Sequence, residues 1–353
     1  MGDTAGARAA YARSLAILQR LADSNPTVTQ FQRDLATCHN NIGSLLSKMG
    51  DPAGGLASCD KALAILQTLT DANPTVTEFQ NQLAFAHLQT GMLLWQAGRP
   101  GEELESYRRA QAIFQKLADT NPAVTNFRTQ LAWTHNNTGY SQSRTGKPDL
   151  ARESYRRALE IFQKLADDNP SATDFQRALA RAIDNIGNLR SEMGKPDEAL
   201  ESYRRALEIQ QKLALANPNV TDFQAAIAGS FVRIGWLLAQ SGELGKAMDY
   251  FALEEPILQR LADANPAVPE YQNSLANCHT NLANVLLRKA RPAEARARCD
   301  QAVALREVLV ITHPNVPEFR QGLAESLLQF GMVRRTERDF ARASADWRRA
   351  IAL

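Results

Sequence analysis

The sequence of 353 residues predicts an all-α protein, built as an α-solenoid of stacked antiparallel helix pairs. Two observations lead to this prediction. A dipeptide that ends in proline recurs in steps of 48 residues, and the residues between its copies follow the apolar period of a helix without the strict alternation of a strand. Length alone would suggest about two or three domains, but an in-phase repeat indicates one elongated array of seven units. The dipeptides are Asn25-Pro26, Asn73-Pro74, Asn121-Pro122, Asn169-Pro170, Asn217-Pro218, Asn265-Pro266 and His313-Pro314.

The first half of each repeat predicts a helix. In the second repeat, apolar residues from Phe79 to Leu94 recur at spacings of three and four, which places them on one helical face. Thr77 followed by Gln80 matches a capping box at the start of this helix. We expect this first helix to be slightly longer than the second helix of the pair.

The second half of each repeat predicts another helix. Gly98 and then Pro100 match a stop followed by a restart. The second helix carries Tyr107 and Phe114 on its apolar face, and it should end before Asn121-Pro122, because proline disfavours a helical conformation in the residue before it.

Both ends of the chain match the second helix of a repeat, so we expect one leading helix and seven pairs, about 15 helices in all. The expected organisation is a single solenoid over 1–353. Its parts are a leading helix over 1–24, full repeats over 25–72, 73–120, 121–168, 169–216, 217–264 and 265–312, and a truncated repeat over 313–353.

Composition and charge narrow the function classes. Lys and Arg number 40 against 38 Asp and Glu, and this near balance argues against a nucleic-acid binder. No apolar run is long enough for a membrane span, and the start of the chain lacks the features of a signal peptide. The sequence contains no phosphate loop, G-x-S-x-G, HExxH or CxxC motif. We therefore expect a cytoplasmic protein that is not an enzyme, has no cofactor, and binds neither nucleic acid nor membrane.

The centre of each repeat resembles the tetratricopeptide repeat (TPR). The fourth repeat has Ile183, Ile186-Gly187, Arg190, Ala199, Tyr203 and Ala206 at the spacing of that family's pattern, and the third has His135, Thr138-Gly139, Gln142, Ala151, Tyr155 and Ala158. The chain departs from the pattern where His or Ile replaces the first Trp, and where 48 residues replace the usual period of about 34. The lengthened repeat is similar to those of kinesin light chains, and the amino-acid sequence of the repeats is similar to that of the TPR arrays of planctomycete bacteria. The resemblance implies a right-handed superhelix whose concave groove is lined by the first helix of each pair.

A column of carboxamides beside the repeated glycine is a candidate binding site in that groove. Carboxamides both donate and accept, so they can bind the backbone of an extended peptide, as in the asparagine ladders of O-linked N-acetylglucosamine transferase and kinesin light chains, which this column resembles. The alternative is that these side chains pack between repeats. The column is Asn41, Gln89, Asn137, Asn185, Arg233, Asn281 and Gln329.

Neighbouring groove positions vary between repeats and carry aromatic and basic residues, as specificity positions would. The candidates are Phe85, Met92, Trp95, Trp133, Tyr140, Arg144 and Trp236. The alternative is that the tryptophans fill gaps between the helices of a long repeat. A ligand with apolar anchors and some acidic character would fit these residues.

Histidines and cysteines also form columns. His39, His87, His135 and His279 are 48 residues or a multiple of 48 apart, too far apart in stacked repeats to share a metal, so we expect them to pack between helices and expect no metal site. Cys38 with Cys59 and Cys278 with Cys299 repeat a spacing of 21 residues. Packing compensation would explain this pattern, and whether the members of each pair touch is left open.

The sequence thus predicts an interaction scaffold that binds an extended peptide or a partner helix. The alternative is a structural or regulatory spacer within a larger multidomain protein, for example a kinase-linked one. A solenoid needs polar end caps, and neither end shows a dedicated one. We therefore expect either that the chain is a segment of a longer protein or that its ends associate with another copy.

Overall fold

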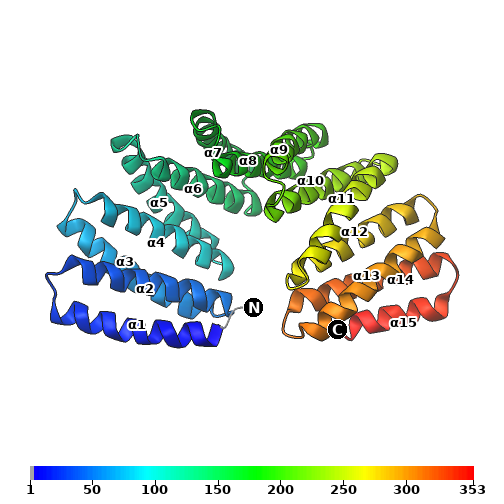
Figure 1. Cartoon of the computed structure of the whole chain (residues 1–353), viewed down its shortest axis with the longest axis horizontal. Coiled ribbons are helices and arrows are strands. Elements are labelled where there is room, and N and C mark those ends of the chain that lie inside the picture. Colours follow the sequence, from blue (N-terminus) through cyan, green and yellow to red (C-terminus); the bar gives the residue numbers. More distant parts are fainter. Residues whose placement is uncertain (1–3) are drawn as a thin grey trace. The chain divides into compact units, whose positions relative to one another are not determined.

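The computed structural model describes residues 4–353, and within this range it contains fifteen α-helices and no strand (Figure 1). The all-α prediction and the helix count are confirmed. The helices are α1 (Thr4–Ser24), α2 (Thr29–Lys48), α3 (Pro52–Ala72), α4 (Thr77–Gln96), α5 (Pro100–Thr120), α6 (Thr125–Arg144), α7 (Pro148–Asp168), α8 (Thr173–Glu192), α9 (Pro196–Ala216), α10 (Thr221–Gln240), α11 (Leu244–Ala264), α12 (Pro269–Arg288), α13 (Pro292–Thr312), α14 (Pro317–Thr336) and α15 (Phe340–Ile351).

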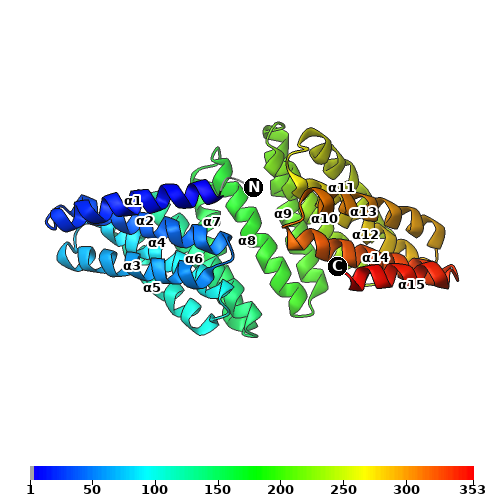
Figure 2. The ribbon, with the colours of Figure 1, turned by 90° about the horizontal axis from the view of Figure 1, so that it is seen from below.

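The chain divides between Phe175 and Gln176 into two compact units, unit 1 before this point and unit 2 after it. We call the even-numbered helices helix A and the odd-numbered ones helix B. Within each unit, consecutive helices pack side by side (Figures 1 and 2), and helices A of neighbouring repeats also touch, α2 with α4, α4 with α6, and α12 with α14. The accessible surface of these helices, α2, α4 and α6 in unit 1 and α10, α12 and α14 in unit 2, is called the helix A face below.

Two turn types set the helix boundaries. At Asn73 the backbone N–H and the side-chain amide both donate to the Leu69 carbonyl oxygen, each at 3.0 Å, and Pro74 then prevents the helix from continuing. At the other end of the repeat, Gly98 adopts a φ of 70°, and Pro100 is the first residue of α5. The stop and restart predicted for this turn are therefore confirmed.

Two details of the helix prediction are wrong. Helix A of each full repeat has 20 residues and helix B has 21, because the proline starts helix B directly after the turn and the helix then runs to the asparagine. The capping box is absent, since Val76 is the N-cap of α4 and makes no side-chain cap bond. Thr77 is already the first helical residue, and Gln80 Nε2 instead donates to the Pro74 carbonyl oxygen at 2.5 Å.

The repeated glycine of helix A makes room for an aromatic side chain of helix B. A Cβ at Gly139 would lie 2.9 Å from Tyr155 Cδ1, closer than carbon atoms pack. Gly91, Gly187, Gly235 and Gly331 meet Tyr107, Tyr203, Phe251 and Trp347 in the same way. Where the column carries Ala283, the paired position is the small Cys299.

The cysteine and histidine columns lie inside the protein. All four cysteines are buried free thiols, and burial raises the pKa of Cys59 to about 11. His39, His87, His135 and His279 are buried, as predicted for packing residues. Residues 4–353 contain no group of three His, Cys, Asp or Glu side chains placed to hold a metal ion. None of the described helices is both long and apolar enough to cross a membrane.

Candidate functional site

Three of the candidate groove residues form one cluster on the helix A face of unit 1. Tyr140 and Arg144 are four residues apart on α6, so they lie on the same side of that helix, next to Trp95 near the end of α4. The Trp95 and Tyr140 rings meet edge to face with centroids 5.5 Å apart. The Arg144 guanidinium carbon lies 4.2 Å from the centre of the Trp95 ring, and Arg144 Nη1 donates to the Tyr140 hydroxyl at 3.2 Å. We call these three residues the Trp95 cluster.

Exposed apolar side chains lie on the same helices as the Trp95 cluster. Met92 and Phe85 on α4 are 51% and 42% exposed, and Tyr140 itself is 45% exposed. Apolar and aromatic side chains left accessible together are typical of surfaces that bind a partner. Trp133 lies differently, because it is half-buried and packs against Phe162 of α7 with ring centroids 4.9 Å apart.

A buried acid below the Trp95 cluster escaped the sequence analysis. Glu103 of α5 is almost fully buried and accepts a hydrogen bond from Ser141 Oγ at 3.0 Å. Burial raises the pKa of its carboxyl, whereas the hydrogen bonds of Ser141 and Tyr107 and the charge of Arg144 lower it. The other full repeats from the third onward carry alanine at this position, at 151, 199, 247 and 295, so an interrupted alanine column was the signal in the sequence.

The carboxamide column divides into exposed and partly engaged members. In unit 1, Asn41 is exposed and Asn137 is half-buried, while Gln89 Nε2 lies 3.4 Å from Ser44 Oγ of α2 and its own oxygen has no partner among the described residues. Gln89 therefore makes a contact between repeats, as the packing alternative expects, and its side-chain oxygen is buried without a partner among the described residues.

In unit 2 the same column is also half-buried. Asn185, Asn281 and Gln329 are partly accessible, and Gln329 Nε2 has no partner among the described residues. Arg233 of α10, the cationic member, forms an ion pair with Asp184 of α8 at 3.4 Å.

A hollow of about 660 Å³ on the helix A face of unit 2 brings together candidate residues that lie 45 or more positions apart. Trp236 and Arg233 of α10 and Asn281 of α12 all line it. Its wall also contains two buried charged residues that sequence reasoning missed, Glu254 of α11 and Arg306 of α13. Each is an exception in the sequence to the residues at equivalent positions of the other repeats: Glu254 stands in a column that is mostly alanine, and Arg306 in a column that is mostly apolar.

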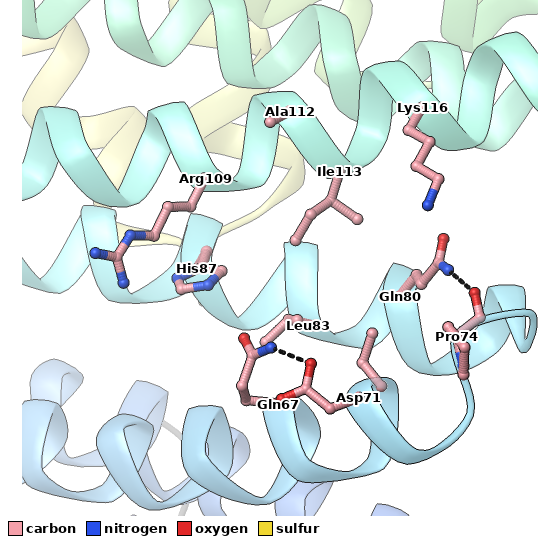
Figure 3. Close-up of a pocket in the computed structure, with 11 residues that line it drawn as sticks. Gln67, Asp71, Pro74, Gln80, Leu83, His87, Arg109, Ala112, Ile113 and Lys116 are labelled. Atoms are coloured by element: carbon pink, nitrogen blue, oxygen red, sulfur yellow. Dashed lines mark hydrogen bonds between the residues drawn. The ribbon is translucent and has the colours of Figure 1, made fainter.

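A second hollow, of about 750 Å³, lies in unit 1 between helices B α3 and α5, over α4 (Figure 3). Its polar walls are largely paired within the protein, since Gln67 donates to Asp71 at 2.8 Å and Gln80 to the Pro74 carbonyl (Figure 3). His87 lines it too, and burial lowers the pKa of this histidine to about 4, so the ring is neutral at pH 7. The same Gln–Asp pair recurs in four other repeats, so we assign this pair to the packing of the repeat.

Comparisons with known proteins agree with this architecture. A tetratricopeptide repeat model matches residues 134–165 and 180–213, and a second one matches residues 275–315. The solved structure of BtubC from P. vanneervenii is similar with a TM-score of 0.57 and 20% identity, over 72% of this chain and 90% of that one. The apo form of RapI is similar with a TM-score of 0.56 and 12% identity, over 97% and 92% of the two chains.

A third similar structure is a Signal Transduction ATPase with Numerous Domains protein with a tetratricopeptide repeat sensor, from Pyrococcus horikoshii. Its TM-score is 0.59 and its identity 12%, and the match covers 99% of this chain but only 47% of that one. At these identities the likeness concerns the fold alone. No curated protein matches the chain.

Fold and repeats together define the class as an all-α helical repeat solenoid. Within this class, the chain contains tetratricopeptide repeats. Repeats of this family are typically scaffolds for protein interactions, and the repeats support this general role for the chain.

Proposed function

We propose that the protein is a non-enzymatic scaffold that binds an extended peptide, or a partner helix, on its helix A face. The observation that carries this proposal is the Trp95 cluster with Met92 beside it. An arginine stacked on a partly exposed tryptophan and bonded to an exposed tyrosine gives a pre-ordered apolar surface with a cationic edge. A partner with apolar anchor side chains and an acidic group next to them suits this surface.

The carboxamides would hold the partner's backbone. Helices packed side by side are about 8–10 Å apart, and an extended peptide advances about 3.3 Å per residue, so one carboxamide can serve about every third residue of the peptide. Asn137 on α6 and Gln89 on α4 are the members of the column on the helices that carry the Trp95 cluster.

Selection from a random peptide library displayed on phage tests this proposal with the full chain as bait. We expect the selected peptides to share aromatic or aliphatic anchors. Trp95→Ala should weaken their binding at least tenfold, as removal of an aromatic anchor does, and Asn137→Ala about fivefold, for the loss of about 1 kcal/mol of hydrogen bonding.

Leu150→Ala is the matched control, because Leu150 is an exposed apolar side chain on helix B α7, outside the helix A face. It should leave binding unchanged. Equal loss in Leu150→Ala and Trp95→Ala would mean unspecific adhesion to apolar surface, and the proposal would then be wrong. Thermal melts of each variant separate loss of binding from loss of fold.

The alternative proposal, a spacer without a ligand of its own, expects that the library yields no peptide sensitive to Trp95 or Asn137. The cytoplasmic location and the bacterial origin stay predictions from the sequence.

A further inference from the structure

One buried glutamate in unit 2 replaces a small residue that the rest of the array keeps. The positions equivalent to Glu254 in five other repeats are all fully buried alanines, at 62, 110, 158, 206 and 302. Glu254 is only 2% exposed, so its carboxyl lies where the other repeats place a methyl group. Two residues further on, Pro256 lies inside α11, where it cannot donate a backbone hydrogen bond. Two departures from the repeat thus fall within one helical turn.

Glu103 in unit 1 shows how such a substitution is satisfied within the fold. It also replaces an alanine of its column, and Ser141 and Tyr107 hydrogen-bond its carboxyl. Glu254 is compensated less fully: Cys278 hydrogen-bonds its carboxyl, but Oε2 is buried without a hydrogen-bond partner among the described residues. A buried acceptor without a partner destabilises a fold, so the repeat alone gives no reason for a carboxyl here.

The hollow that Glu254 lines contains further glutamate side chains. Glu270 of α12 and Glu325 of α14 also line it, so three helices each contribute a carboxyl. Glu325 accepts a hydrogen bond from Gln321 at 3.0 Å, and its charge acts on Arg306. Glu255, next to Glu254 on α11, is not among the lining residues, since it pairs with Arg298 and lies 3.8 Å from His279.

The two cations of the hollow are already engaged. Arg233 of α10 pairs with Asp184. Arg306 of α13 is 1% exposed and donates to the Gly322 carbonyl at 2.6 Å, to Ser326 Oγ at 2.5 Å and to Asn277. On the α12 side the remaining titratable neighbour is Cys278, which burial and the nearby glutamates keep as a neutral thiol by raising its pKa. Two buried polar atoms of the hollow have no hydrogen-bond partner among the described residues, Arg306 Nε and Glu254 Oε2, and of these two groups only the carboxyl can attract a cation.

We propose that this hollow binds a cationic group, an ammonium or a guanidinium, with Glu254 as its counter-ion and Glu270 and Glu325 attracting it at the rim. The cation would be a lysine or arginine side chain of a bound partner, and only this choice of source rests on the proposed function. Trp236 and Tyr271, which also line the hollow, offer aromatic surface to the methylene groups of such a side chain or to its charge.

Binding of a cation should release a proton. Burial raises the pKa of Glu254 to about 8, so the carboxyl is mostly protonated at pH 7 in the free protein. A bound cation favours the carboxylate, and the proton then passes to the solvent. Above pH 8 the carboxylate is already formed, so the proton release should disappear there.

Isothermal titration of the full chain with n-butylammonium and with ethylguanidinium at pH 7, in two buffers of different ionisation enthalpy, tests the site without any peptide. We expect saturable millimolar binding, as befits ligands of so few atoms, with close to one proton released. Glu254→Ala should weaken binding at least tenfold and also raise the Tm, since it restores the residue of the other repeats. The neutral probe n-butanol should bind no more than weakly.

Glu307→Ala, which removes a partly exposed glutamate of α13 that pairs with Arg349 outside the hollow, is the control and should bind like the wild type. Equal binding of butylammonium by the wild type and Glu254→Ala, or no saturable binding at all, would overturn the site. A further comparison uses peptides from the selection in which norleucine replaces lysine. If the small cations bind but both forms of a peptide bind equally well, the cation site is retained, and the proposal that a peptide supplies the cation is wrong.

Discussion

His87 and His135 are buried bases held neutral by the fold. Burial is the main cause that lowers the pKa of each to about 4, and the charges of Arg109 and Arg157 act in the same direction. In the unfolded chain both rings titrate near their ordinary pKa of about 6.5. Between these values the unfolded chain binds more protons than the folded one, so the free energy of unfolding falls as the pH falls.

We therefore expect stability to be complete above pH 6.5 and to decrease down to about pH 4, by roughly 3 kcal/mol for each histidine. Urea titrations at a series of pH values measure this. His135→Ile should make the pH dependence shallower, because the next repeat carries Ile183 at the equivalent position. An unchanged slope in this variant would contradict the assignment to His135.

At the scale of the helix pair, the contact between the glycine of helix A and the large residue of helix B sets how closely the two helices approach. Tyr155 lies directly on Gly139, so any side chain at position 139 needs a smaller partner on helix B. The pair of Ala283 and Cys299 fits this rule, whereas the first repeat keeps glycine opposite a small residue, with Gly43 facing Cys59.

Gly139→Ala should consequently destabilise the protein by about 1–3 kcal/mol through overpacking. Tyr155→Cys should also destabilise it, by leaving a cavity. The double variant reproduces the Ala283 and Cys299 combination, so its free energy of unfolding should exceed the additive expectation by about 1 kcal/mol or more. Chemical denaturation of the four proteins measures the coupling, and strict additivity would refute the size-matching rule.

The helices themselves were predictable, because their boundaries depend on local residues. Prolines, glycines and asparagines at a fixed spacing determine where helices start and stop, and the turn around Gly98 and Pro100 follows these rules. The capping box failed because Thr77 and Gln80 match a pattern that several neighbouring registers satisfy. The residue at which the helix begins depends on the turn at Pro74, because the carbonyl oxygen of Pro74 accepts a hydrogen bond from the Gln80 side chain.

The candidate site was predictable only in part, because it depends on contacts between repeats. The sequence indicates Trp95, Tyr140 and Arg144 as separate candidates, but the stacking of Arg144 on Trp95 needs the packing of α4 against α6. Glu254 and Arg306 do not follow from the pattern that the repeats share, because both residues are exceptions to their columns.

At the scale of the whole molecule, both terminal helices in the described range expose apolar side chains. Ile17 on α1 and Ile351 on α15 are 60% and 84% exposed. The equivalents of Ile17 in the next two repeats, Ile65 and Ile113, are partly buried against neighbouring helices. The expected end-to-end association would bury these side chains against a second copy.

Light scattering over a range of protein concentrations tests this expectation. The average mass should rise above that of one chain as the concentration increases, and Ile351→Asp should reduce the rise, because a buried carboxylate opposes association. Leu150→Asp, which places the same charge on helix α7 away from the terminal helices, serves as the control. A strict monomer at high concentration would rule out self-association.

The repeated glycine and the bulky residue that covers it belong to one 48-residue block, with an Asn-Pro or His-Pro turn at each border. A genetic crossover in the codons of that turn would therefore transfer both fitted partners at once. Gene duplication or loss could then lengthen or shorten the array without leaving a mismatched core, and lineages could vary the number of binding modules while each module stayed intact.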